Sequence, residues 1–236
     1  MASEPTPEQD YQTFMWVVAH PDDLDFPSGG TVAKFVKEGK KVVLIQVTSG
    51  DRGTTDRSFT PEVLGNTREA EELESAKRLG VDEVVFLREP DGAVVPDLAL
   101  REKITKLIRT YRPDVIVTHD PFRPYALHPD HRAVGMATHD AVYPTARDHL
   151  YFPDHLASGL EPHKTAEIWY FGTDKPDIYI DITDTFEDKI HGLKAHVTQV
   201  GEATELAERM RGFSAETAKD QDFELAEAYK VIKMRR

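Results

Sequence analysis

Residues 13–23 read TFMWVVAHPDD, and this stretch decides how the rest of the chain is interpreted. Its first seven residues form an apolar run rich in β-branched and aromatic side chains, which is typical of a strand buried on both faces of a parallel sheet. The turn His20-Pro21-Asp22-Asp23 follows directly. The stretch therefore predicts a buried strand that carries one histidine and two carboxylates at its carboxyl end.

Strands and helices alternate along most of the chain beyond this stretch. We expect further strands at residues 41–47, 83–87, 114–118, 167–171 and 177–182. We expect helices at residues 31–37, 60–79 and 98–111, another from His131, and a mostly helical chain from Asp184 to the end. This alternation predicts an α/β fold in which one Rossmann-like domain, residues 1–236, has a mainly parallel sheet with helices on both faces.

The composition excludes several classes of protein. The 236 residues include no cysteine, which rules out disulfides, thiolate nucleophiles and cysteine metal ligands. The net charge of −13, from 29 basic and 42 acidic residues, repels phosphate backbones, so we expect no nucleic-acid partner. No apolar run is long enough to span a bilayer, so we expect no membrane insertion. Residues 1–12 are too polar and acidic for a signal peptide, and we expect a flexible leader on a cytoplasmic protein.

A polar loop follows each of the first four predicted strands. These loops are residues 20–23, 48–53 and 89–92 and, after the fourth strand, Asp120 with residues 128–131. Because ligands of open α/β sheets bind outside the carboxyl ends of the strands, the loops should converge on one binding edge. All four are rich in charged residues and turn formers, so this edge is the predicted functional site.

Two of these loops have the chemistry of a metal centre. His20 and Asp23 are three residues apart on a tight turn, and His128 and His131 have the same spacing. Two histidines and one carboxylate would bind zinc and leave a coordination position for water, which is the catalytic arrangement. The remaining carboxylate, Asp22, would act as general base, and the remaining histidine could donate to an oxyanion. One such tetrapeptide alone is often only a turn, but two clusters after buried strands favour a metal site.

Two other classes of protein are compatible with an α/β pattern. A binding protein could use the pocket for a metal or a sugar without turnover, but the spare carboxylate of Asp22 argues against it, since a binding site needs no base. A nucleotide-binding domain would need a glycine-rich loop after the first strand. Neither G-x-G-x-x-G nor G-x-x-x-x-G-K-[ST] is present, so this class ranks low.

The sequence resembles the LmbE-like, or PIG-L, family of zinc-dependent de-N-acetylases. The family includes N-acetylglucosaminyl-phosphatidylinositol de-N-acetylases, mycothiol and bacillithiol deacetylases and archaeal diacetylchitobiose deacetylases. The specific matches are Ala19-His20-Pro21-Asp22-Asp23 with Gly29-Gly30-Thr31, and His128-Pro129-Asp130-His131. Weaker matches, in the right order and spacing, are Thr67-Arg68-Glu69, Leu79-Gly80-Val81, Phe86-Leu87, Asp91-Gly92, Asp181-Ile182-Thr183 and Ala195-His196-Val197-Thr198-Gln199.

This resemblance implies a hydrolase that removes the N-acetyl group from an N-acetylglucosamine-type amino sugar or its conjugate. It implies that His20, Asp23 and His131 bind zinc. It also implies that Asp22 is the general base and that His128 stabilises the oxyanion or protonates the departing amine. Fe²⁺ or another divalent metal suits the same ligands.

Further implications concern the substrate and the assembly. Arg68 and Asp91 match positions that hold sugar hydroxyls, whereas His196 and Gln199 match a family hallmark to which we assign no role. The partner would be a small amino-sugar molecule, and family members often form trimers or hexamers. An alternative reading of the same zinc site is an amidase that acts on an amino-sugar thiol conjugate.

The chain departs from the family pattern in three places. Many members have glutamate after the two aspartates, whereas this chain has Leu24 followed by Asp25. Residues 51–59 and 147–164 match nothing in the family, and we expect both to frame the substrate. The second segment has little periodicity, which also suits an insertion near the site or an interface loop.

Overall fold

The computed structural model describes residues 11–201 and 205–234. Most of the predicted leader, residues 1–12, therefore lies outside the described residues. Its last residue, Gln12, is tied to the sheet, because its N–H donates to Asp114 Oδ2 at 2.9 Å and its carbonyl accepts from the Lys41 N–H at 2.8 Å. Among the described residues, no helix combines the length and apolar character needed to cross a membrane.

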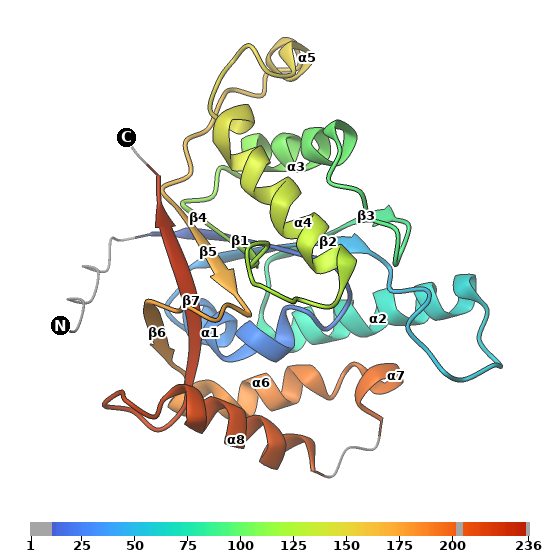
Figure 1. Cartoon of the computed structure of the whole chain (residues 1–236), viewed down its shortest axis with the longest axis vertical. Helices are drawn as coiled ribbons and strands as arrows, with labels where there is room; N and C mark the ends of the chain where they lie inside the picture. The colour runs from blue at the N-terminus through green and yellow to red at the C-terminus, as the bar shows by residue number, and fades with distance from the viewer. Residues whose placement is uncertain (1–10, 202–204, 235–236) are drawn as a thin grey trace.

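A seven-stranded sheet forms the centre of the molecule, in the order β3-β2-β1-β4-β5-β7-β6 (Figure 1). The strands are β1 (Thr13–Val18), β2 (Lys41–Thr48), β3 (Glu83–Glu89), β4 (Val115–His119), β5 (Glu167–Phe171), β6 (Ile178–Asp181) and β7 (Ala226–Lys233). The first five are parallel, and β7 is antiparallel to both of its neighbours. The predicted α/β fold with a mainly parallel sheet is confirmed. The chain order reverses between β1 and β4, which is where such sheets bind ligands.

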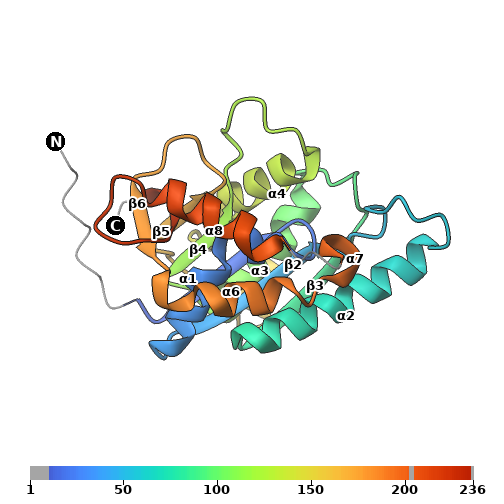
Figure 2. The same ribbon diagram turned by 90° about the horizontal axis from the view of Figure 1, so that it is seen from below.

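Helices cover both faces of this sheet, as Figures 1 and 2 show. One face carries α3 (Leu98–Tyr111), α4 (Pro129–Asp140) and the π-helical segment η1 (Ala141–Ala146), and the other carries α1 (Asp25–Lys37) and α2 (Pro61–Leu79). The remaining helical segments are α5 (Pro153–Ala157), η2 (Thr183–Thr185), α6 (Phe186–Leu193), α7 (Val197–Val200) and α8 (Leu206–Thr217). Of these, α6 packs against α1 and α2, and α8 packs against α6.

The two covered faces explain the continuous apolar run of β1. Val17 points into the core beneath α3 and α4, and its neighbour Trp16 points into the core beneath α1. Both side chains are fully buried. Successive residues of a strand face opposite sides, so a sheet covered on both sides requires apolar residues at every position.

The expectation of a mostly helical chain after Asp184 is wrong for its last part. Residues 226–233 form β7, which inserts between β5 and β6. The sequence AEAYKVIK contains alanine, glutamate and lysine, which favour helices in isolation. Hydrogen bonding to strands on both sides and burial of Tyr229 override this local preference.

A buried charge pair ties β7 to the helices beside it. Glu227 Oε1 lies 2.6 Å from Lys189 Nζ of α6, and both side chains are 3% exposed or less. The same carboxylate accepts the N–H groups of Gly30 and Thr31 of α1, at 3.1 and 2.7 Å. Gly30 must be glycine here, because a Cβ would lie 2.7 Å from the Cβ of Ile182.

We expect Glu227→Gln to lower the free energy of unfolding by about 3–5 kcal/mol, because it leaves the Lys189 ammonium buried without its counter-charge. Denaturant unfolding measures the change. Asp188→Asn is the matched control: its partner Lys37 is exposed, so the loss should be at most about 1 kcal/mol. Equal losses in the two variants would contradict a structural role for the buried pair.

Residues 147–164 do not frame the predicted binding edge. His163 donates its N–H to Ala146 O at 2.9 Å, and its Nε2 lies 2.7 Å from Pro113 O, just before β4 begins. Arg109, near the end of α3, donates to the carbonyls of Asp148 and Tyr151. These contacts hold the segment at the amino ends of the strands, so the expectation that it contacts substrate is wrong. Its role as an interface loop stays a prediction.

Candidate metal and catalytic site

The predicted histidine and aspartate clusters meet where β1 and β4 end. His20 follows β1, whereas His128 and His131 lie at the start of α4 after β4. The three imidazole rings are adjacent: the ring centroid of His20 lies 4.4 Å from that of His128 and 5.3 Å from that of His131. Loops separated by more than one hundred residues thus converge on one edge of the sheet, as their positions after the strands predict.

The first turn of α4 orients two of these rings. His128 is the N-cap residue and Pro129 occupies the first turn, where its missing N–H costs nothing. His128 Nδ1 accepts the Asp130 N–H at 3.2 Å, so the neutral ring carries its proton on Nε2. Burial and the neighbouring His20 and His131 rings lower the pKa of His128. His128 is therefore a neutral hydrogen-bond donor at neutral pH.

Asp23 lies between the other two predicted ligands. One of its carboxylate oxygens lies 3.1 Å from His20 Nδ1, and the other lies 3.2 Å from His131 Nε2. Burial alone would raise the pKa of Asp23, but the contacts with His119, His131 and His20 hold it well below the usual range. Asp23 is therefore an ionised carboxylate with an imidazole on each side.

Negative charge gathers around His20. Its Nε2 lies 3.1 Å from Asp91 Oδ1 and 3.2 Å from Asp130 Oδ2. Burial lowers the pKa of His20, but the hydrogen bonds to Asp23 and Asp91 outweigh it and raise the pKa to about 10. The surroundings of His20 thus favour a positive charge.

This donor set fits a divalent metal. His20, Asp23 and His131 supply two imidazole nitrogens and a carboxylate, the ligand types that zinc prefers. Two overlapping groups of donor atoms each lie within 4.8 Å of one another: His20 with His128 and His131, and Asp23 with His119 and His131. The surplus of carboxylates around the rings would be balanced by a cation.

His119 is a histidine of this cluster that the sequence analysis missed. It ends β4, and its ring stacks on His131 at a centroid distance of 4.1 Å. Its Nε2 lies 3.2 Å from the Ala19 backbone nitrogen, whose N–H it accepts, and 3.4 Å from Asp23 Oδ2. Burial lowers the pKa of His119 to about 4. His119 is therefore a neutral ring that supports the cluster, and its place directly after the DVIVT run was the signal available in the sequence.

Asp22 contacts two residues of α2. Its Oδ2 lies 3.4 Å from a terminal nitrogen of Arg68, and its N–H donates to Glu72 Oε2 at 3.0 Å. Its φ of 94° is in the left-handed region. Burial, with the adjacent Asp23 carboxylate, raises the pKa of Asp22 to about 7 against the opposing charge of Arg68. Asp22 is thus a carboxylate with a raised proton affinity beside the candidate metal ligands.

Arg68 and Asp91, the predicted sugar-binding residues, both contact the loop that carries His20 and Asp22. Buried Arg68 donates to Pro21 O at 2.6 Å and to Gly50 O at 3.0 Å. Gly50 has a φ of +63°, and a Cβ there would lie 2.3 Å from the Arg68 guanidinium, so only glycine fits. Asp91 contacts His20 through one oxygen and accepts the Arg52 N–H at 2.8 Å through the other.

The loop of residues 51–59 borders the site. Arg52 is tied to Asp91, and Gly53 O accepts a hydrogen bond from Gln199 Nε2 at 3.2 Å. This contact places one member of the Ala195–Gln199 motif beside the loop. The loop therefore lies near His20, unlike residues 147–164, and its contact with substrate stays a prediction.

A second polar group lies next to Asp22 and is formed by Asp25, Glu72 and His196. All three side chains are buried, and they come from α1, α2 and the residue before α7. Sequence reasoning linked none of them to the site, because only the tertiary fold brings them together. One signal was available: Glu72 follows Arg68 by four residues, so the two share a face of α2.

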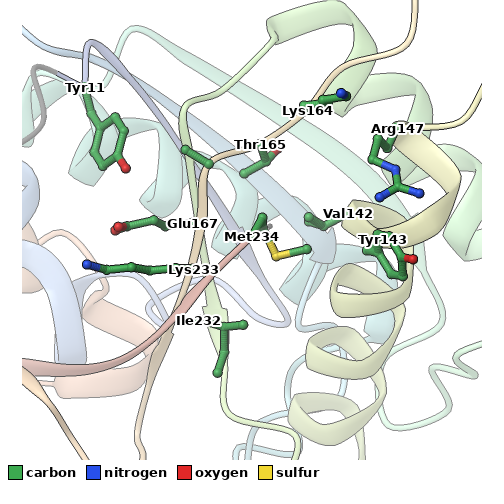
Figure 3. A pocket seen from close by; sticks show the side chains of 11 residues that line it. Tyr11, Val142, Tyr143, Arg147, Lys164, Thr165, Glu167, Ile232, Lys233 and Met234 are labelled. Carbon is green, nitrogen blue, oxygen red and sulfur yellow. The ribbon is translucent and has the colours of Figure 1, made fainter. Parts of the chain in front are cut away.

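A large pocket lies elsewhere. It has a volume of about 960 Å³ and is lined by Tyr11, Arg147, Lys164 and Met234, among others (Figure 3). These residues flank the amino ends of β1 and β5 rather than their carboxyl ends. None of the predicted site residues lines it. The volume of a pocket therefore does not identify the candidate site in this molecule.

The fold and the site define a Rossmann-like α/β protein with a candidate metal centre at the sheet's switch point. The family model of the GlcNAc-PI de-N-acetylases, PIG-L, matches residues 15–142. This match spans β1 to η1 and includes every predicted metal ligand. The chain belongs to this family, as the sequence resemblance predicts.

Individual relatives agree with this membership. The diacetylchitobiose deacetylase of Thermococcus kodakarensis is 33% identical over 196 residues, covering 83% of this chain and 73% of the relative. The 1D-myo-inositol 2-acetamido-2-deoxy-α-D-glucopyranoside deacetylase of Mycobacteroides abscessus is 31% identical over 226 residues, covering 79% and 81%. The structure of the N,N'-diacetylchitobiose deacetylase of Pyrococcus horikoshii, complexed with an inhibitor, superposes with a TM-score of 0.90 at 29% identity, covering 95% and 85%.

Proposed function

We propose that this protein is a metal-dependent hydrolase that removes the acetyl group from the nitrogen of an N-acetylglucosamine-type amino sugar or its conjugate. The observation that carries the proposal is the placement of Asp23 between His20 and His131, with Asp22 beside it. The names of the relatives support the substrate class: diacetylchitobiose and the inositol glycoside share a 2-acetamido-2-deoxyglucose unit and differ in what is attached to it.

In this proposal His20, Asp23 and His131 hold the metal, with zinc as the first choice and Fe²⁺ as an alternative. When bound, the metal would polarise the acetyl carbonyl and lower the pKa of a water molecule. The aspartates Asp91 and Asp130 would hold the His20 ring in place, since both lie within 3.2 Å of its Nε2.

The reaction is hydrolysis of an amide. Asp22 accepts a proton as the water oxygen forms a bond to the acetyl carbon, and its raised pKa suits this role. The Nε2–H of His128 donates a hydrogen bond to the developing oxyanion, a role supported by its neutral state. The C–N bond then breaks as the nitrogen gains the proton that Asp22 accepted, and acetate and a free amine leave.

Arg68 and Asp91 are proposed to hold sugar hydroxyls at the inner end of the site. We expect Arg68→Met to lower kcat/KM for diacetylchitobiose by about 10–100-fold and to leave the metal content unchanged. Arg88→Met is the matched control, because Arg88 is an exposed cation that pairs with Glu69. Steady-state kinetics with metal analysis measures both variants, and equal kinetics would remove Arg68 from the site.

A runner-up function keeps the metal centre and changes the substrate. An amidase acting on an amino-sugar thiol conjugate would use the same ligands and differ in the loops, such as residues 51–59. Acetate release from N-acetylglucosamine, diacetylchitobiose and a thiol conjugate, each with and without chelator, separates the two. A protein that binds these sugars without releasing acetate at any metal loading would be a binding module, which would contradict the proposal.

The setting of this activity is also proposed. The chain acts as one domain in the cytoplasm on a small amino-sugar molecule, and it assembles as a trimer or hexamer. Sedimentation of the purified protein measures the assembly.

A further inference from the structure

We propose that Glu72, Asp25 and His196 form a positioning device that holds the backbone of Asp22 in the conformation its reaction requires. This inference rests on the proposed function, in which Asp22 is the general base. It assigns a role to His196, a residue of the Ala195–Gln199 motif that the proposed reaction does not use directly.

The three side chains form one buried group, in which Asp25 and His196 are hydrogen-bonded and Glu72 lies next to them. His196 Nε2 lies 3.1 Å from Asp25 Oδ2, and the other Asp25 oxygen accepts the hydroxyl of Ser75 at 2.5 Å. Asp25 and His196 are 0% exposed and Glu72 is 1% exposed. Donor atoms of Asp25, Glu72 and His196 all lie within 4.8 Å of one another. Burying ionisable groups is costly, so pure packing would be served better by apolar side chains.

One direct contact links this group to the site. The Asp22 N–H donates to Glu72 Oε2 at 3.0 Å. Asp22 has a φ of 94°, which a non-glycine residue keeps only when its surroundings hold it there. The acceptor on Glu72 fixes this peptide, and the peptide in turn fixes where the carboxylate of Asp22 points.

The other backbone contacts of Asp22 act on its carbonyl, which accepts the N–H groups of Asp25 and Phe26 at 3.0 and 3.2 Å, so Glu72 is the partner of its N–H. The Arg68 guanidinium reaches the Asp22 side chain only at 3.4 Å, and its short hydrogen bond goes to the preceding carbonyl, Pro21 O, at 2.6 Å. Arg68 therefore binds the carbonyl of the peptide that joins Pro21 to Asp22, and Glu72 binds the N–H of the same peptide. Arg68 and Glu72 lie one helical turn apart on α2, so a single rigid helix presents both.

Asp25 and His196 also restrict the position of Glu72. Asp25 starts α1 and His196 precedes α7, so their contact joins two helices around the face of α2 that carries Glu72. Close packing is required there: a Cβ on Gly192 of α6 would lie 2.8 Å from Asp25 Oδ1. The Asp25–His196 pair thus limits the positions open to Glu72.

A pair of variants at Glu72 tests the inference. Glu72→Met removes the acceptor and keeps the volume, whereas Glu72→Gln keeps an oxygen that can accept the Asp22 N–H. We expect Glu72→Met to lower kcat for acetate release from diacetylchitobiose on the order of 10²-fold, with KM and metal content little changed. Glu72→Gln should retain more of kcat than Glu72→Met. Equal losses of kcat in both, or none in either, would overturn the inference.

Two further measurements separate positioning from general damage. When Asp22 is already replaced by asparagine, adding Glu72→Met should lower kcat only slightly further, because Glu72 acts through Asp22. Glu227→Gln removes another buried carboxylate, so it should lower Tm without a comparable loss of kcat. Additive losses, or an equal kcat loss in Glu227→Gln, would indicate destabilisation instead of positioning.

A structural measurement, which requires no enzyme activity, distinguishes failure of this inference from failure of the proposed function. Crystal structures of zinc-loaded wild type and Glu72→Met should show the Asp22 backbone leaving the left-handed region while His20, Asp23 and His131 stay in place. An unmoved Asp22 would refute the positioning role even if the substrate were misassigned. A second equivalent of zinc in wild type that Glu72→Gln loses would make the group a metal site and refute the inference too.

Discussion

Replacing Asp22 by asparagine should leave the bound metal in place and lower kcat for acetate release by a factor on the order of 10²–10⁴. Asparagine keeps the size and hydrogen-bonding capacity of the side chain but cannot take a proton from water. The Asp22 side chain makes its hydrogen bond to Arg68, and the ring nitrogens of the predicted ligands contact Asp23 instead. Metal occupancy should therefore not depend on the charge of Asp22.

Metal analysis and kcat measured on the same Asp22→Asn sample decide this prediction. Protein with full metal and full activity would exclude Asp22 as the general base. Protein that loses metal and activity together would instead make Asp22 a ligand or a determinant of folding. The far-ultraviolet circular dichroism spectrum should match that of wild type, because the N–H contact to Glu72 is unaffected by the change.

Asp23→Ala should abolish tight metal binding and, with it, nearly all activity. Asp23 contacts His20 with one oxygen and His131 with the other, so its removal takes away one predicted ligand and the restraint on two more. Equilibrium dialysis against zinc measures the loss. Asp120→Ala is the matched control, since Asp120 lies at the same edge after β4 and its carboxylate accepts the Phe122 N–H at 2.9 Å. Equal metal affinity in the two variants would contradict the assignment of Asp23.

The fold was predictable where local signals and tertiary packing agree. Helix α2 begins after Thr60, whose side chain accepts the Val63 N–H, and ends at Gly80 in the left-handed conformation, as the Thr-Pro start and the glycine indicate. Strand β7 was not predictable in the same way. Its residues favour a helix locally, and only pairing with β5 and β6 makes them a strand.

The candidate site shows the same division. The clusters around His20 and His131 could be located because the carboxyl ends of parallel strands share one edge. The engaged Nε2 of His119 and the group beside Asp22 depend on contacts between residues far apart in the chain. No spacing in the sequence encodes those contacts, so they required the three-dimensional structure.

The pocket at the amino edge has a practical consequence for handling this protein. Tyr11, just before β1, and Met234, just after β7, both line it. A bead or electrode surface coupled through either position would hold the molecule by the side opposite His20 and His131. Immobilised in this orientation, the protein would present its histidine-rich edge to the surrounding liquid, which suits flow reactors and metal-sensing films.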